Sequence, residues 1–179
     1  MVVFTVIGAT QTGKTTYVKN VILPRYRKGI VYDVQNQYPD LPFYKPNMKG
    51  WSRISPTELS FEKFVLLGQA ISGYLFIYEE ATQFLEGKIS REMKANLVGK
   101  AHTQNRFLFF FHAFSQIPPR ILDFTDYIIQ FRTGVSDLEG VKKKGRTLEI
   151  IKSYHDLEKA ERFTKHIHRV SNLAKESIF

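Results

Sequence analysis

The chain has 179 residues, with 26 Lys or Arg against 17 Asp or Glu, which gives a formal net charge of +9. Its 43% apolar residues are enough for the core of a single domain of ordinary size, which excludes disordered and low-complexity classes. No Cys is present, which excludes disulfide frameworks, thiol nucleophiles and Cys-ligated metal sites.

Short apolar runs alternate with helical patterns along most of the chain. In chain order, the first half is predicted to hold a strand at Met1–Ile7, a helix at Lys14–Leu23, a strand at Gly29–Asp33, a long surface connection at Gln35–Ser55, and a helix from Ser55 or Ser60 to Ile71. Next we predict a strand at Tyr74–Tyr78, a helix at Ser90–His102, a strand at Arg106–Phe111, a short helix at Arg120–Phe124 and a strand at Tyr127–Phe131. At the C-terminus we predict a sixth strand as an option at Thr147–Ile151 and an amphipathic helix from Asp156 to Val170.

This alternation predicts an α/β fold with three layers (α/β/α), in which a mostly parallel sheet of five or six strands has helices on both faces. We expect residues 1–152 to form the core and residues 153–179 to form a C-terminal helix and tail that packs on the core or extends from it. Ligands of such sheets bind beyond the carboxyl ends of the strands, so the polar residues after each strand are the candidate site.

Two observations bear on the membrane. No apolar run approaches the length of about 18 residues that a membrane helix needs. The apolar N-terminus has no basic start and no cleavage site, so it does not read as a signal peptide. We therefore expect a soluble protein without stable membrane insertion.

The segment after the first predicted strand fits the phosphate-binding pattern G-x-x-x-x-G-K-[ST] in full. Its residues are Gly8, Ala9, Thr10, Gln11, Thr12, Gly13, Lys14 and Thr15, with Thr16 following. Glycines permit the turn that aims backbone N–H groups at an anion, and the new helix directs its positive end to the same point. We expect Lys14 to reach the β- and γ-phosphates of a nucleotide and Thr15 to ligate Mg²⁺. The alternative is a plain strand-to-helix turn.

Two acids follow the strand at Tyr74–Tyr78. A phosphate-binding loop of this kind works with a carboxylate on a neighbouring strand that holds Mg²⁺, and often with a second that orients the attacking water. We assign Glu79 to the metal side and Glu80 to the catalytic base. The alternative is a strand that ends in solvated acids.

Polar residues also follow the other strands. His112 comes directly after the strand at Arg106–Phe111, where a polar side chain of a P-loop ATPase can sense the γ-phosphate; the equal alternative is a histidine satisfied by a backbone carbonyl. Asp33, Gln35 and Gln37 follow the strand at Gly29–Asp33. Because no guanine-reading N-K-x-D segment is present, ATP is the expected nucleotide.

From about Val2 to Thr133 the chain resembles P-loop ATPases of the FtsK–HerA superfamily, and within them the small viral genome-packaging ATPases. The resemblance is carried by GATQTGKTT, IVYDVQNQY, YLFIYEEAT, the helix through Gly99–His102, and FLFFFHAFSQIPPRI. The chain departs from the family at three positions, where His112 stands for a usual Gln, Lys100 for a usual Arg, and Gln37 for a frequent Glu. Zonula-occludens-toxin-like ATPases of filamentous phage assembly share much of the pattern.

The resemblance implies an ATP-hydrolysing motor that translocates viral DNA and packages the genome into a capsid as a homo-oligomeric ring, in the host cytoplasm, in the virion, or both. An arginine of one subunit would act at the ATP of its neighbour, and capsid or portal-type proteins are further partners. The candidates for this arginine are Arg91, Arg106, Arg120 and Arg132. DNA would be held through its phosphates, with the basic run Lys142–Arg146 as one candidate lining.

Three alternatives stay open at this point. One is an ATPase of filamentous-phage-type assembly or extrusion, which includes a non-catalytic assembly role, and another is a small nucleotide or metabolite kinase. The basic charge by itself is equally consistent with a solvated surface that has no specific ligand.

Overall fold

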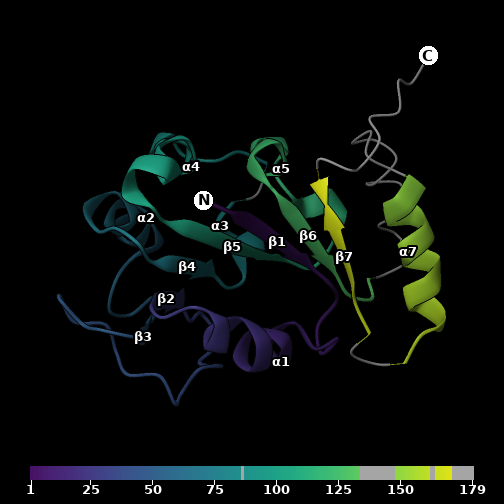
Figure 1. Ribbon diagram of the computed structural model, residues 1–179, viewed down its shortest axis with the longest axis horizontal. Helices are drawn as coiled ribbons and strands as arrows, with labels where there is room; N and C mark the ends of the chain where they lie inside the picture. Colours follow the sequence, from purple (N-terminus) through teal and green to yellow (C-terminus); the bar gives the residue numbers. More distant parts are fainter. Residues whose placement is uncertain (86, 134–147, 162–163, 171–179) are drawn as a thin grey trace.

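A computed structural model describes residues 1–85, 87–133, 148–161 and 164–170. Its centre is one seven-stranded sheet in the order β3-β2-β4-β5-β1-β6-β7 (Figure 1). The strands are β1 (Val3–Ile7), β2 (Gly29–Tyr32), β3 (Trp51–Ile54), β4 (Leu75–Tyr78), β5 (Arg106–Phe111), β6 (Tyr127–Gln130) and β7 (His166–Arg169). All neighbours pair in parallel except β7, which runs antiparallel to β6. The sheet is therefore mostly parallel, as predicted, but has more strands than expected.

Helices cover both faces of the sheet. In Figure 1, α1 lies below the sheet, α2, α4 and α5 lie above it, and α7 stands beside β7. The α-helices are α1 (Lys14–Tyr17), α2 (Phe61–Ala70), α3 (Ala81–Phe84), α4 (Arg91–Thr103), α5 (Pro119–Phe124) and α7 (Leu148–Lys159). After α1 the chain continues as a π-helical turn (Val18–Ile22) and a 3₁₀ turn (Leu23–Arg25) that contains Pro24. The three-layer α/β/α prediction is confirmed.

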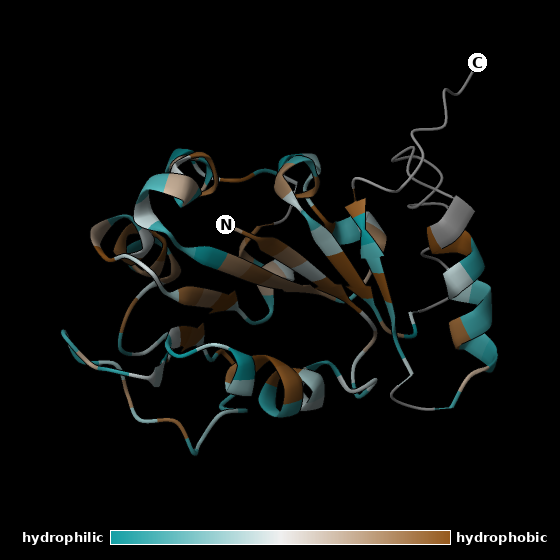
Figure 2. Cartoon of the chain, viewed as in Figure 1, coloured by the Kyte–Doolittle hydropathy of each residue, from teal (hydrophilic) through white to brown (hydrophobic). Residues whose placement is uncertain are grey.

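The sheet separates two apolar cores, because successive side chains of a strand point to opposite faces. On β4, Phe76 and Tyr78 pack on the side of α2 and α4, whereas Leu75 and Ile77 pack on the side of α1. In Figure 2 the central strands are mostly brown, whereas β7 and the helices carry both teal and brown residues. Full burial of each large apolar side chain contributes about 1.5–3 kcal/mol to folding. Because helices cover both faces of the central strands, both sets of side chains are apolar and the strands appear in the sequence as continuous apolar runs.

Two of the predicted helix starts are confirmed by their caps. The Ser60 side chain accepts a hydrogen bond from the Lys63 N–H, and that of Ser90 accepts one from the Met93 N–H. Ser55 and Glu58 also bond to each other, but they close a turn before α2 rather than begin the helix. A serine cap satisfies one N–H that the first turn of a helix leaves without a partner.

The prediction that Gln35–Ser55 is only a surface connection is wrong at its end, because Trp51–Ile54 forms β3. This strand pairs with β2, and its Ser52 and Ile54 are buried. Three prolines precede the strand, but none lies in it. An edge strand of four residues carries too weak a local pattern to be recognised beside them.

The C-terminal predictions are wrong in both elements. Thr147–Ile151 was expected as a strand, but Leu148–Lys159 is helix α7, and the expected helix from Asp156 to Val170 is replaced by the end of α7 and by β7. Ile150, Tyr154 and Leu157 are buried at helical spacing, which places them on one face of α7. The β-branched pair Ile150–Ile151 resembled a strand, and tertiary packing decided for the helix.

The segment after the expected boundary at residue 152 takes part in the same sheet. Helix α7 runs across residue 152, and β7 forms the antiparallel edge next to β6.

Among the described residues, no helix combines the length and the apolar composition that a membrane span requires.

Candidate active site

The phosphate-binding pattern forms the turn between β1 and α1, as its residues predict. Gly13 has φ 103°, a left-handed conformation that favours glycine, and the helix begins directly after it at Lys14. Gly8 lies so close to its neighbours that a Cβ there would stand 2.7 Å from the Phe131 Cβ. The Ala9 N–H donates to the Arg132 carbonyl over 2.8 Å. Gly8 therefore allows the loop to pack closely against the segment that follows β6, and Gly13 allows the left-handed turn from which α1 begins.

The Lys14 side chain lies across this loop and is buried, with 9% of its surface exposed. Its Nζ donates to the carbonyls of Gly8 and, over 2.9 Å, of Ala9. Burial lowers the pKa of Lys14 to about 8, although the charges of Glu80 and Glu79 act in the opposite direction. Lys14 is thus a desolvated cation beside two acids, in the position expected for a phosphate ligand.

Glu79 follows β4 directly and is almost fully buried, at 2% exposure. Neither carboxylate oxygen has a hydrogen-bond partner of ordinary geometry in the described part of the chain. Burial raises the pKa of Glu79 to about 9, and the nearby Asp33 and Glu80 carboxyls add to the effect. A buried carboxylate of this kind calls for a positive partner, and a divalent cation bound between it and the Thr15 hydroxyl would supply one.

Glu80 comes next and is positioned by an unusual backbone. Its φ of 54° lies in the left-handed region, which costs a non-glycine residue about 1–2 kcal/mol. The Glu80 Oε2 lies 2.7 Å from the His112 Nε2 at the end of β5, the strand next to β4. Glu80 contacts His112 from this left-handed conformation, and strained residues of this kind concentrate at functional sites.

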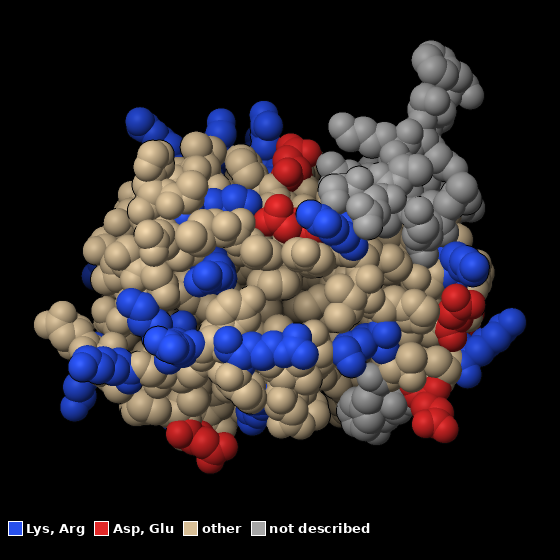
Figure 3. Space-filling view, in the orientation of Figure 1, with Lys and Arg blue, Asp and Glu red and all other residues tan. Residues whose placement is uncertain are grey.

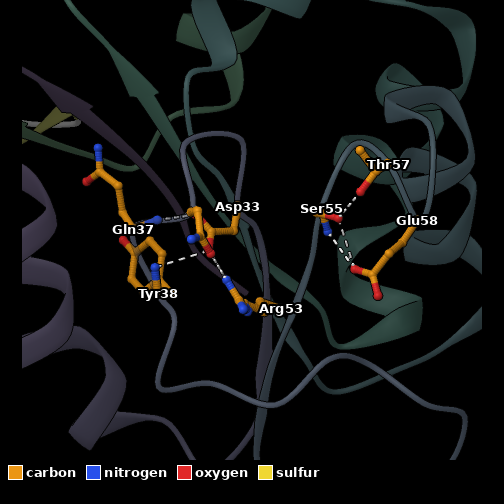
Figure 4. A network of polar contacts seen from close by, with 8 residues as sticks. Asp33, Gln37, Tyr38, Arg53, Ser55, Thr57 and Glu58 are labelled. Atoms are coloured by element: carbon orange, nitrogen blue, oxygen red, sulfur yellow. Dashed lines mark hydrogen bonds and ion pairs between the residues drawn. The ribbon is translucent and has the colours of Figure 1, made fainter.

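The turn after β2 adds a third set of polar groups (Figure 4). The Asp33 carboxylate accepts from the backbone N–H groups of Gln37 and Tyr38 and pairs with Arg53 at 3.1 Å. It thereby fixes the turn that carries Gln37. The Thr15 hydroxyl donates to the Gln37 Oε1 over 2.6 Å.

These residues line one cleft of about 350 Å³ at the carboxyl edge of the sheet. Its lining includes Thr10, Gln11, Gly13, Lys14, Thr15, Thr16, Glu79, Glu80 and His112 from the predicted set, together with Gln35, Gln37 and Phe110. Gly8, Ala9 and Thr12 shape the loop from behind: the Thr12 hydroxyl donates to the Ala9 carbonyl over 2.8 Å. Sequence reasoning missed Phe110, whose place inside an apolar strand gave no signal. It also missed the Arg53–Asp33 pair, because Arg53 lies on β3 and Asp33 in the turn after β2.

The four candidate arginines lie at different places. Arg132 is exposed just after β6 beside the loop, whereas Arg106 begins β5 at the opposite, amino edge of the sheet. Arg91 is exposed at the start of α4, and Arg120 pairs with Asp123 at 3.6 Å on the surface of α5. The choice among them stays a prediction, and the Lys142–Arg146 run lies outside the described residues.

No family model matches the chain, and no curated protein matches it in sequence. Its structure is similar to the genome packaging NTPase B204 from Sulfolobus turreted icosahedral virus 2 in complex with AMPPCP, with a TM-score of 0.78 at 15% identity over 96% of this chain and 94% of the other. It is also similar to B204, the DNA-packaging ATPase from Sulfolobus turreted icosahedral virus, with a TM-score of 0.76 at 16% identity over the same shares of both chains.

A weaker likeness joins the chain to the N-terminal domain of zonular occludens toxin from Neisseria meningitidis, with a TM-score of 0.47 at 10% identity over 74% of this chain and 78% of the other. That score is too low to argue from. At such identities the B204 structures establish the fold, and the chain has the P-loop NTPase fold that its motifs predicted.

Proposed function

We propose that this chain is an ATP-hydrolysing motor that translocates viral DNA, packaging the genome into a capsid as a homo-oligomeric ring. The observation that carries the proposal is the joint lining of one cleft by the phosphate-binding loop, by Glu79 and by Glu80 with His112. The fold likeness to a genome packaging NTPase supports the packaging role, and the net charge of +9 supports DNA as the partner. Its place would be the host cytoplasm, the virion, or both.

In this proposal the loop binds ATP with its N–H groups, and Lys14 gives up its carbonyl contacts to reach the β- and γ-phosphates. Thr15 and Glu79 would hold Mg²⁺, which neutralises charge on those phosphates when bound. Gln37 would release the Thr15 hydroxyl for this purpose.

Glu80 is the group that would take a proton from the attacking water. As the water oxygen bonds to the γ-phosphorus, the bond from that phosphorus to the bridging oxygen breaks, and ADP leaves with the bridging oxygen. His112 holds the carboxylate of Glu80 in place at 2.7 Å. Base catalysis of this kind contributes roughly 10²–10⁴-fold to a rate.

The test is ATP hydrolysis measured with and without DNA over a range of protein concentrations. We expect DNA to stimulate hydrolysis, and activity to rise more than linearly with protein if subunits share sites. Lys14→Ala should abolish hydrolysis, and Glu80→Gln should lower kcat at least about a hundredfold while ATP binding persists.

Three results would count against the proposal. Unchanged hydrolysis in Lys14→Ala would remove the nucleotide site, and turnover that requires a small phosphate acceptor would favour a kinase. A wild-type protein that ignores DNA but co-sediments with lipid or coat protein would favour a role in phage-type assembly.

A further inference from the structure

A second cavity, of about 710 Å³, lies at the edge of the sheet opposite the nucleotide cleft. Three of its lining segments, residues 25–28, 47–50 and 73–74, lead directly into β2, β3 and β4, and the fourth element is Arg106 at the start of β5. Because these strands are parallel, all four elements meet at the amino edge. The cavity therefore cannot serve the same subunit's P-loop, which lies at the carboxyl edge.

The lining of this cavity is cationic. It carries five basic side chains and no acidic one, namely Arg25, Arg27, Lys28, Lys49 and Arg106. None of the five forms an ion pair with a carboxylate in the described part of the chain. In Figure 3, Lys and Arg side chains gather over the β2 and β3 end of the sheet. Uncompensated cations in a concave site focus a positive potential and attract polyanions.

Hydrogen bonds and a cation–π contact hold the walls of the cavity in place, and they involve only some of its basic side chains. The Lys28 Nζ lies 4.1 Å from the centre of the Tyr74 ring and donates to the Ser72 carbonyl. Tyr74 in turn donates its hydroxyl to the Met48 carbonyl, which ties the loop before β3 to β4. Trp51 donates to the Tyr26 carbonyl over 2.8 Å and anchors the opposite wall.

Three of the cations, Arg25, Arg27 and Lys49, are exposed on these walls. Their side chains can turn to a ligand without breaking an ion pair within the described residues. The exposed large apolar side chains of the described chain do not line the cavity, which disfavours insertion into a membrane.

We propose that this cavity binds the sugar-phosphate backbone of nucleic acid, and that it is where the DNA of the proposed function contacts the subunit. Its volume exceeds what one phosphate fills, and cations on both walls match the repeated charges of a strand. Contacts of this kind position the backbone and carry no sequence information. The inference rests on the proposed function only in taking DNA as the nucleic acid.

The experiment compares two triple variants of the full chain with the wild type. Arg25→Gln, Arg27→Gln and Lys49→Gln together empty the cavity of its exposed charge. Lys63→Gln, Lys94→Gln and Lys152→Gln remove the same net charge from exposed positions on α2, α4 and α7. Binding of a mixed-sequence labelled DNA is measured by fluorescence anisotropy at several salt concentrations, and circular dichroism checks that each variant is folded.

We expect the cavity variant to bind at least about tenfold more weakly and its salt dependence to flatten by about one slope unit for each lost phosphate contact. The control variant should stay close to the wild type. Hydrolysis of ATP without DNA should be unchanged in the cavity variant. A DNA strand that carries 4-thiothymidine should cross-link to the peptide containing Tyr26 or Met48.

Equal DNA binding by the wild type and the cavity variant would overturn the inference while leaving the proposed function intact. DNA binding that depends on the cavity but never stimulates ATP hydrolysis would uphold the inference and contradict the motor. A cavity variant that binds DNA normally but loses the steep rise of hydrolysis with protein concentration would also overturn the inference, because the cavity would then receive a neighbouring subunit's nucleotide phosphates.

Discussion

Replacing Glu79 by Gln should remove a pH dependence of folding that the buried carboxyl imposes. Its pKa is raised from the ordinary 4.5 to about 9, first by burial and then by Asp33. Between these pH values the folded protein holds a proton on Glu79 that the unfolded chain has released. Stability from this group is therefore fully present below pH 4.5 and is lost as the pH rises toward 9.

The size of the effect follows from the shift. One pKa unit corresponds to about 1.4 kcal/mol, so the wild type should lose about 3 kcal/mol relative to Glu79→Gln over two pH units. The interval from about pH 5.5 to 7.5 lies below the pKa of Lys14, which is about 8, so that lysine stays mostly protonated. Gln resembles the protonated carboxyl in shape and charge, so the two proteins should differ little only near pH 4.5 and below. At pH 5.5 the wild type should already have lost about 1.4 kcal/mol.

The assay is urea unfolding followed by circular dichroism at several pH values in this interval, with EDTA present and nucleotide absent. The difference in unfolding free energy between Glu79→Gln and the wild type should grow with pH. Glu62→Gln, which removes an exposed carboxylate from the first turn of α2, serves as the control and should run parallel to the wild type. Parallel curves for the wild type and Glu79→Gln would refute the claim that burial and the neighbouring carboxyls raise the pKa of Glu79 far above its ordinary value.

Three further predictions test other parts of the molecule. Gly8→Ala should destabilise the fold by about 1–3 kcal/mol in urea unfolding, because the new methyl would press on Phe131. The control Gly99→Ala meets open space on α4 and should be neutral or stabilising by up to about 1 kcal/mol. Similar effects of the two substitutions would contradict the packing at Gly8. His112→Ala should lower kcat about tenfold with little change in KM, because Glu80 loses the contact that positions it. His112→Asn should restore part of the lost kcat by holding Glu80. A change confined to KM would contradict the positioning role. Asn105→Ala should cost about 2–4 kcal/mol of unfolding free energy. The buried amide of Asn105 donates hydrogen bonds to the carbonyls of Gly68 and Ile71 and accepts one from the N–H of Tyr74. A loss below about 0.5 kcal/mol would show that water replaces those bonds.

The cleft that we propose as the nucleotide site was predictable because its main parts are local in sequence. The loop from Gly8 to Thr15 needs only a strand before it and a helix after it, and Glu79 and Glu80 need only to follow an apolar strand. Parallel strands bring their carboxyl ends to one edge, so these short patterns are enough to place the groups in one cleft.

Tertiary contacts decided the rest. The sequence Thr147–Ile151 is compatible with strand or helix, and the buried face of Ile150, Tyr154 and Leu157 settles its described part, residues 148–151, as helix. In the same way, β7 is polar and short, and its pairing with β6 is what makes it a strand. Local preference is too weak in both segments to prevail over packing and ladder hydrogen bonds.

The sequence by itself determined the fold class, the strand-to-helix loop from Gly8 to Thr15 and the two acids that follow β4, because each depends on neighbours along the chain. Only the tertiary structure revealed the Glu80–His112 contact and the cationic cavity at the amino edge. That cavity collects Tyr26, Lys49, Tyr74 and Arg106, which are separated by long stretches of chain. They meet because the order of the sheet places β2, β3, β4 and β5 near one another, and sheet order is fixed by the packing of both faces rather than by any one segment.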